Sequence, residues 1–482
     1  MARKKELFPE LPGLRLSASE RKLLLVVVDV LVLCLALLAA LTLRAGYHFA
    51  WYTPIQVPVY FLLLMALWAA WASFFGCYDL PLTADASRSA WSTGRAALLA
   101  ALTYLLIPVY SPPFLTSRLS VVVFVGLVVV SVPTWRALYA AVFSQPLFQR
   151  RFLIVGAGRS GSELVRELAG VPQFGNPYAG SGCQVVGFVD DDPAKAGTTV
   201  EGVPVLGDRH DLRRLVGEYD VDVVVVAITH TPEIHPELFQ TLLDCQEQGV
   251  RLEPMTSVYE RLTGKVPVEH SGRDLYVVMT LSDSATRRVF TVSKRLFDLV
   301  AGLIGLTILI PIAVCVALAD LVWCPGPVFY WQTRVGRGGR TFQLIKFRTM
   351  IPDAEDGSGP VWAQKKDTRV TPVGQVLRRT RLDELPQVWS ILKGEMSLIG
   401  PRPERPEFVA DLVRQVPFYQ ARHAVRPGIT GWAQVRYEYG STVRDALVKL
   451  QYDLYYIKHQ SLYLELSIML KTVRVMLGMR GR

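Results

Sequence analysis

The chain has 482 residues, of which 51% are hydrophobic, and a mean hydropathy of +0.27, which together exclude a single soluble domain of ordinary size. Its net charge of +10 is concentrated near the C-terminus: residues 287–482 hold 29 Lys and Arg against 16 Asp and Glu, and the rest holds 23 against 26. A basic segment suits phosphate groups and anionic lipid. Nucleic acid is the rival partner, but we do not expect it because no nucleic-acid-binding motif accompanies the charge.

Four apolar stretches open the chain, at 23–43, 57–76, 94–112 and 119–142. A helix needs about 20 residues to cross the hydrocarbon layer, so we expect four transmembrane helices within a region covering 1–149. The third stretch is the weakest because prolines interrupt its end. Basic residues before the first stretch place the N-terminus in the cytoplasm by the positive-inside rule; they are Arg3, Lys4, Lys5, Arg15, Arg21 and Lys22.

Residues 150–262 change to short runs of β-branched residues that alternate with helical patterns. We expect strands at 151–156, 185–190 and 221–228 and a helix at 161–168. Apolar strands interleaved with helices are typical of a parallel sheet covered by helices. The segment is therefore predicted to be a small Rossmann-like α/β domain.

Gly156, Gly158 and Gly161 form a G-x-G-x-x-G pattern between the first strand and the first helix of this domain. Such glycines let a backbone approach a pyrophosphate. The acidic residue of that pattern normally follows after about 20 residues, whereas Asp190 lies 29 residues beyond Gly161. We favour a structural or regulatory domain and keep a bound nucleotide as the alternative.

A linker, 263–290, leads to a second apolar stretch, 296–322, with Pro311 at its centre. Proline lacks the N–H that would bond the Thr307 carbonyl, so we expect the helix to break there, with the Thr307 hydroxyl as a nearby partner. Basic residues flank both ends, which favours a re-entrant helix with both ends in the cytoplasm. These residues are Arg287, Arg288, Lys294 and Arg295 before it, and Arg334, Arg337, Arg340, Lys346 and Arg348 after it.

The next pattern is a hairpin, with strands at 328–335 and 341–349 around a glycine-rich turn. Two adjacent carboxylates, Asp383 and Glu384, then stand in a basic run from Arg378 to Gln387. Carboxylates at a helix start among arginines stay ionised and can ligate Mg²⁺ or attack phosphorus. A solvated helix cap would give the same pattern.

Basic residues in other segments favour a functional site over a solvated helix cap. Lys346 and Arg348 close the hairpin, and a Gly/Pro-rich loop at 394–404 presents Arg402. A second tight loop follows at 426–432. Arginines hold phosphates bidentately, and cations neutralise charge on a transferring phosphoryl group. The sequence therefore predicts a phosphate-handling site.

The last forty residues carry an apolar stripe at helical spacing, formed by Leu447, Leu450, Leu454 and Ile457. Two interpretations stay open for it. Either these residues form a helix that packs on its own domain, or they form a helix that lies in the membrane interface.

Four motifs stand in order: K-F-R-T-M at 346–350, L-D-E-L-P-Q at 382–387, G-P-R-P at 400–403 and R-P-G-I-T-G-W at 426–432. On these motifs, residues 285–482 resemble the monotopic phosphoglycosyl transferases of the bacterial sugar transferase superfamily. The resemblance implies an α+β catalytic domain, 291–482, with a re-entrant membrane helix. The four spans and the Rossmann-like domain resemble the large, WbaP-type members, which start polysaccharide or O-antigen assembly.

The resemblance implies a two-step reaction. Asp383 would attack the sugar-bearing phosphorus of a UDP-sugar and release UMP, and polyprenyl phosphate would then take the sugar phosphate. Asp383 would also ligate Mg²⁺, with Glu384 as its catalytic partner, and the implied substrate contacts are Lys346, Arg348, Arg378, Arg402 and Glu404. The sequence departs from the family in having Arg381 where Ser is frequent and Ile310 before Pro311 where Ser is frequent.

We therefore expect a multi-pass enzyme of the bacterial inner membrane, with its active site on the cytoplasmic face, that forms a homo-oligomer, a dimer. The alternative is a membrane-tethered, NAD-dependent sugar-nucleotide dehydratase or oxidoreductase, but residues 150–290 lack the Tyr-x-x-x-Lys pair expected of those enzymes. A non-enzymatic scaffold is a third interpretation, for the N-terminal half alone. The sequence does not specify the sugar.

Overall fold

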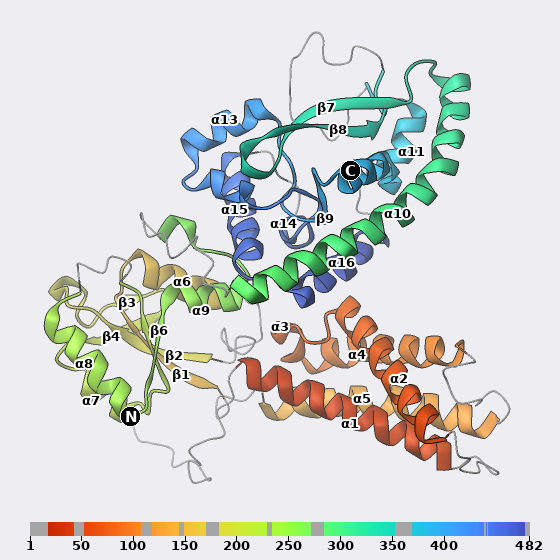
Figure 1. Ribbon diagram of the computed structural model, residues 1–482. Helices are drawn as coiled ribbons and strands as arrows, with labels where there is room; N and C mark the ends of the chain where they lie inside the picture. The colour runs from red at the N-terminus through yellow and green to blue at the C-terminus, as the bar shows by residue number, and fades with distance from the viewer. Residues whose placement is uncertain are drawn as a thin grey trace. The chain divides into compact units, whose positions relative to one another are not determined.

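The computed structural model describes residues 18–42, 53–107, 118–143, 149–169, 183–228, 234–270, 284–351, 369–437, 440 and 442–477. The chain divides into two compact units, Met1–Thr263 and Gly264–Arg482 (Figure 1). Pro108, Pro112 and Pro113, at the end of the third apolar stretch, lie outside the described residues. The sequence predicts a finer division, into segments 1–149, 150–262, 263–290 and 291–482. The two units do not test those boundaries, which stay a prediction.

The first unit opens with the helices α1 (Ala18–Thr42), α2 (Thr53–Phe75), α3 (Leu80–Thr83), α4 (Ala86–Leu105) and α5 (Arg118–Phe143). Within the described residues, the helices long and apolar enough to cross a membrane lie at Glu20–Thr42, Pro58–Phe75, Arg118–Phe143 and Arg288–Trp323. The chain is accordingly a membrane protein. Three of the four predicted spans meet this criterion. The third corresponds to α4, which contains Arg88 and Arg95 and falls short of it.

An ion pair lies inside this helical bundle, between Asp29 of α1 and Arg136 of α5, and both side chains are fully buried. Arg136 Nε donates to Asp29 Oδ1 at 3.1 Å, and Nη1 donates to the Cys77 carbonyl at 2.9 Å. The Tyr78 hydroxyl donates to Asp29 Oδ2 at 2.9 Å. Removing either charge would leave the other buried without compensation, so the pair ties α1, α5 and the end of α2 together.

The α/β part of this unit is a six-stranded sheet in the order β3-β4-β2-β1-β5-β6. Its strands are β1 (Arg150–Val155), β2 (Cys183–Val189), β3 (Thr199–Val200), β4 (Val203–Gly207), β5 (Val223–Val226) and β6 (Arg251–Pro254). All neighbouring pairs are parallel except β3–β4. The sheet and the three predicted strands are confirmed, to within a few residues at their ends.

Helices cover both faces of this sheet. Leucines and valines of α6 (Arg159–Ala169) pack on one face together with α9 (Met255–Thr263). Residues of α7 (Leu212–Glu218) and α8 (Pro236–Glu247) pack on the other face. A short 3-10 turn, η3 (Pro193–Lys195), follows β2.

The glycine pattern of this domain has a packing reason. Gly156 has a φ of +103°, and a Cβ on Gly161 would lie 2.1 Å from the Gly156 carbonyl oxygen. A Cβ on Gly158 would meet nothing within 4 Å. Asp190 directly follows β2, and its carboxylate accepts from the Ala157 amide at 2.7 Å and from Lys195 Nζ at 3.1 Å. The long sequence separation of Asp190 therefore does not keep it away from the glycine turn. Nucleotide binding at Gly156, Gly158 and Gly161 stays a prediction.

The second unit starts with a 3-10 turn, η5 (Val268–His270), and a 40-residue helix, α10 (Ser284–Trp323). The helix continues through Pro311 and bends along its length in Figure 1. The Thr307 hydroxyl donates to the Leu303 carbonyl at 3.0 Å, in its own helix. The predicted break at Pro311 is therefore corrected to a continuous helix that bends. The re-entrant topology stays a prediction.

The rest of this unit is α+β. The hairpin of β7 (Phe329–Val335) and β8 (Thr341–Phe347), joined by η7 (Arg337–Gly339), is confirmed. Then come α11 (Pro372–Thr380), η8 (Leu382–Gln387), α12 (Val388–Lys393), β9 (Ser397–Ile399), α13 (Pro406–Gln415), η9 (Tyr419–Ala424), β10 (Gly428–Thr430), α14 (Trp432–Arg436), α15 (Val443–Lys458) and α16 (Leu462–Leu477).

The apolar stripe near the C-terminus lies on α15. Leu450, Leu454 and Ile457 are buried in the core of this unit. The helix therefore packs on its own domain, which decides between the two interpretations of that stripe. Helix α16, in contrast, leaves large apolar side chains exposed: Leu462, Tyr463, Leu466, Val473 and Met476.

Candidate active site

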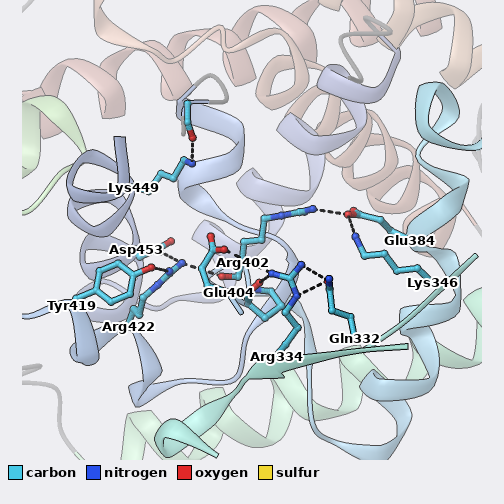
Figure 2. Close-up of polar contacts among 12 residues, drawn as sticks. Gln332, Arg334, Lys346, Glu384, Arg402, Glu404, Tyr419, Arg422, Lys449 and Asp453 are labelled. Atoms are coloured by element: carbon cyan, nitrogen blue, oxygen red, sulfur yellow. Dashed lines mark hydrogen bonds and ion pairs between the residues drawn. The ribbon is translucent and has the colours of Figure 1, made fainter. Parts of the chain in front are cut away.

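The acidic pair lies in the first turn of η8, opposite the end of strand β8. Glu384 is buried, and one of its oxygens accepts two charged hydrogen bonds. Lys346 Nζ of β8 donates to Glu384 Oε1 at 2.9 Å, and Arg402 Nη2 donates to the same atom at 2.7 Å (Figure 2). Three predicted site residues, from parts of the sequence up to 56 positions apart, thus meet at one carboxylate.

Burial and neighbouring charges have opposing effects on the pKa values of Glu384 and Lys346. Burial alone would raise the pKa of the Glu384 carboxyl, but Arg402 and Lys346 outweigh it and hold that pKa well below its usual range. Burial lowers the pKa of the Lys346 amine, and the Glu384 charge opposes that change. Glu384 is therefore a permanent anion that fixes the two cations.

Asp383 differs from its neighbour. Its carboxylate is half-buried, and no hydrogen bond or ion pair joins it to a residue that the structure describes. Burial and the charge of Glu384 raise its pKa, against the opposing effect of Lys346, Arg402 and Arg378. A carboxylate that is close to three cations but not bonded to them is available to a ligand.

Arg378 comes from the last turn of α11. Its Nε donates to the buried Thr349 hydroxyl at 2.9 Å, which fixes the guanidinium near Asp383. Arg381, which follows at the end of α11, has a φ of +63°. This left-handed residue ends α11 and starts η8, so the turn that presents Asp383 depends on a conformation that costs a non-glycine residue energy.

The loop that carries Arg402 is built by two of the sequence motifs together. β9 and β10 pair in parallel, Gly400 N donates to the Thr430 carbonyl at 2.9 Å, and Gly428 N donates to the Pro401 carbonyl at 2.9 Å. A Cβ on Gly400 would lie 2.4 Å from the Arg426 carbonyl oxygen. The G-P-R-P and R-P-G-I-T-G-W motifs are thus two sides of one backbone contact.

Glu404 is placed beside the hairpin. Its side chain lies 3.8 Å from Arg334 Nη1, and its carbonyl accepts from the Val335 amide at 3.0 Å. Both contacts hold the loop against β7, and the contact to substrate stays a prediction.

Arg348 is placed differently from Lys346. Its side chain is buried, Nε donates to the Pro327 carbonyl at 2.8 Å, and Nη2 donates to the Cys324 carbonyl. Asp320 of α10 lies 3.6 Å from Nη2. These contacts cap the end of α10, so the structure does not bring Arg348 to the carboxylate pair. Its predicted substrate contact has no support in this geometry.

The residues that sequence reasoning missed lie behind the Arg402 loop. Arg422 of η9 is buried, donates to the Asp453 carboxylate at 2.9 Å and contacts the Tyr419 hydroxyl. Burial raises the pKa of Asp453 to about 6. Single polar residues in helical segments carry no signal of such a contact, because Asp453 lies 31 positions from Arg422 in the sequence.

Among the described residues, no group of three or more His, Cys, Asp or Glu side chains could hold a metal ion. Mg²⁺ needs no such group, because it keeps several waters and takes one or two carboxylates with substrate phosphates. The Asp383 carboxylate, which has no bonded partner in the described part of the chain, fits that requirement. Mg²⁺ binding by Asp383 stays a prediction.

Two parts of the chain match known families. Residues 289–479 match a family described as bacterial sugar transferase, and residues 73–238 match one described as CoA-binding domain. The first match contains all the residues assembled at the site above.

Three of the curated relatives to which this chain is similar have names that state an activity. A UDP-N-acetylgalactosamine-undecaprenyl-phosphate N-acetylgalactosaminephosphotransferase from Aeromonas hydrophila is 38% identical, over 60% of this chain and 66% of the relative. A UDP-glucose:undecaprenyl-phosphate glucose-1-phosphate transferase from Xanthomonas campestris is 35% identical, over 58% of each. One of the same name from Caulobacter vibrioides is 42% identical, over 37% of this chain and 68% of the relative. The chain thus spans about three fifths to two thirds of these relatives' lengths.

Proposed function

Because the chain belongs to the bacterial sugar transferase family, we propose that it transfers a sugar 1-phosphate from a UDP-sugar to undecaprenyl phosphate and releases UMP. The observation that carries the proposal is the half-buried Asp383 carboxylate, which has no bonded partner among the described residues and lies beside Lys346, Arg378 and Arg402. Two of the three relatives are named for glucose and one for N-acetylgalactosamine. We therefore leave the sugar as a hexose or an N-acetylhexosamine.

The proposed reaction has two steps. A carboxylate oxygen of Asp383 attacks the sugar-bearing phosphorus, and the bond from that phosphorus to the bridging oxygen breaks, so UMP leaves with the bonding electrons. A phosphate oxygen of the lipid then attacks the same phosphorus and expels the Asp383 carboxylate. Covalent catalysis divides one difficult encounter of two anions into two easier displacements.

The surrounding cations support each step. Lys346 and Arg402 are held 2.9 and 2.7 Å from Glu384, so they are fixed before substrate arrives. Fixed cations stabilise charge on a transferring phosphoryl group without reorganising at the moment of reaction. If Mg²⁺ binds to Asp383, it would neutralise more of the diphosphate charge.

The basic segment and the apolar helix α10 support a location at the inner membrane with the site on the cytoplasmic face, where the positive flanks of the helix would stay. We also propose a homodimer and a re-entrant α10.

The test is a UMP-release screen of the purified chain over several UDP-sugars with undecaprenyl phosphate present. We expect UMP release with one or a few UDP-sugars and continued turnover only with the lipid. No UMP from any UDP-sugar, or NAD-dependent conversion of the sugar nucleotide instead, would contradict the proposal.

A further inference from the structure

Three consecutive backbone carbonyls in the Arg402 loop accept hydrogen bonds from outside the loop. The Arg402 carbonyl accepts from Arg422 Nη2 at 3.0 Å, and the Pro403 carbonyl accepts from Arg334 Nη1 at 3.1 Å. The Glu404 carbonyl accepts from the Val335 amide at 3.0 Å. Two proline residues stiffen the loop further. The backbone that carries Arg402 is therefore held from two directions.

Arg422 is the part of this support that comes from the helical side of the unit. Its guanidinium lies between Tyr419, Asp453 and the Arg402 backbone (Figure 2). Asp453 of α15 is 2% exposed and Arg422 is 6% exposed. Few conformations are open to a buried guanidinium that is bonded to a buried carboxylate, so its bond to the loop is directional as well as strong.

We propose that Arg422 is a positioning residue of the active site, which fixes the Arg402 backbone so that the Arg402 guanidinium reaches Glu384. The kinetic part of this inference rests on the proposed function, because it gives Arg402 a role in turnover. The claim that Arg422 fixes the Arg402 backbone does not depend on the proposed function.

The physical reason is the length of the Arg402 side chain. That side chain is one third exposed and would sample several rotamers if its backbone could shift. Misplacement of a catalytic group by about 1 Å can cost roughly 100-fold in rate. A backbone anchor that is buried and charged limits that loss more effectively than packing of the exposed side chain would.

Arg422→Lys is the variant that tests this. Lysine keeps the charge opposite Asp453 but has a single terminal nitrogen. It cannot occupy both the Nη1 position that bonds Tyr419 and the Nη2 position that bonds Asp453 and the Arg402 carbonyl. We expect hydrogen exchange at the amides of Gly400, Gly428 and Val335, whose bonds hold this loop, to become faster, with exchange at Lys346 unchanged. Exchange at the loop as slow as in the parent chain would overturn the proposal, whether or not the chain is a transferase.

A double-mutant cycle supplies the kinetic readout. We expect Arg422→Lys to lower kcat for UMP release roughly 10- to 100-fold, but less than threefold further when Arg402 is already Gln. Independent effects, which multiply in the double variant, would show that Arg422 acts in some other way. Absence of UMP release by the parent chain would contradict the proposed function alone, because the exchange experiment still decides the role of Arg422.

Two further variants keep the test decisive. Arg414→Lys, an exposed position on α13, should change neither exchange nor kcat. If Arg422→Lys does not fold, Tyr419→Phe removes one acceptor of Arg422 and keeps its ion pair with Asp453. Tyr419→Phe should give a smaller increase in exchange at the loop and a smaller loss of kcat than Arg422→Lys. Unchanged loop exchange in Tyr419→Phe would overturn the proposal.

Discussion

Asp383 and Glu384 are neighbours in η8, and their surroundings move the pKa values of their carboxyl groups in opposite directions. Glu384 is bonded to Lys346 and Arg402 and stays an anion. Asp383 has the same cations nearby but no such bond within the described residues. The pair therefore divides into a fixed counter-ion, Glu384, and a carboxylate with no bonded partner among the described residues, Asp383, which we propose as the nucleophile.

This division predicts different effects of two conservative changes. Asp383→Asn should bind UDP-sugar yet abolish UMP release, because the amide is a poor nucleophile. Glu384→Gln should be severely impaired, because it loses the charge that holds both cations, but it should still form adduct slowly. Mass spectrometry after incubation with UDP-sugar and Mg²⁺, without lipid, measures the adduct.

Trypsin cleavage after Arg381 and Lys393 would place both carboxylates in one peptide, 382–393. Fragmentation of that peptide locates the added sugar phosphate on Asp383 or on Glu384. A robustly active Asp383→Asn enzyme would mean that the nucleophile is another residue.

The pH dependence of adduct formation follows from the pKa of Asp383. Attack needs the ionised carboxylate, so the rate falls as pH falls through this pKa, which burial raises. Arg378 opposes that rise, so Arg378→Gln should move the acid limb to higher pH, by up to roughly one unit. Arg379→Gln, one position along the same helix and exposed, is the matched control and should leave the limb in place. A shift to lower pH would contradict the assignment.

The sequence locates Asp383, Lys346 and Arg402 because local patterns present them: a strand end, a helix start and a Gly/Pro loop. It does not reveal that Glu384 bonds to both cations, or that Arg422 lies behind Arg402, because these contacts join distant segments. Arg348 shows the opposite limitation. It is only two positions from Lys346, but it lies just beyond β8, and its guanidinium caps α10 instead.

For the fold, too, the sequence predicts what depends on local periodicity and not what depends on tertiary contacts. Alternating strands and helices predict the parallel sheet of the first unit, because the periodicity is local. The separation of Asp190 from the glycine pattern in sequence does not reveal their contact. They meet because β1 and β2 are parallel neighbours whose carboxyl ends lie at the same edge of the sheet. The continuity of α10 through Pro311 was missed for a related reason: tertiary contacts on both halves of a helix can preserve it where proline alone would end it.

The middle domain offers a matched pair of glycine variants. Gly158→Ala should leave most transferase activity and the melting temperature intact, because the new methyl group meets nothing within 4 Å. Gly161→Ala should destabilise the domain, because its methyl group would lie 2.1 Å from the Gly156 carbonyl oxygen. Thermal unfolding and UMP release of the full chain measure both. A well-folded Gly158→Ala protein with almost no activity would show that the glycine turn takes part in turnover.

The topology of α10 can be tested by cysteine labelling. Val292→Cys and Arg337→Cys, placed in a chain whose six native cysteines are replaced by serine, report on the two ends of the helix. We expect a membrane-impermeant maleimide to label both from the cytoplasmic side only, since positive charge flanks both ends. Labelling from opposite sides would establish that α10 crosses the membrane.

The bend of α10 connects two anchor points in the same unit. In its first half, Lys294 Nζ donates to the Ile399 carbonyl at 3.0 Å and Asp298 accepts from the Leu398 amide at 2.9 Å, next to the Arg402 loop. In its second half, Val316 packs with Phe347, at the end of the strand that carries Lys346. Both halves therefore contact elements of the active site.

Pro311→Ala should weaken this arrangement. Alanine restores an N–H that can bond the Thr307 carbonyl and favours a straight helix, so one set of anchors would be strained or lost. We expect lower UMP release and a lower melting temperature. Ile310→Ala, at an exposed neighbouring position, removes side-chain volume without restoring the hydrogen bond and is the control. Full activity of Pro311→Ala beside full activity of Ile310→Ala would show that the active site tolerates a straight α10.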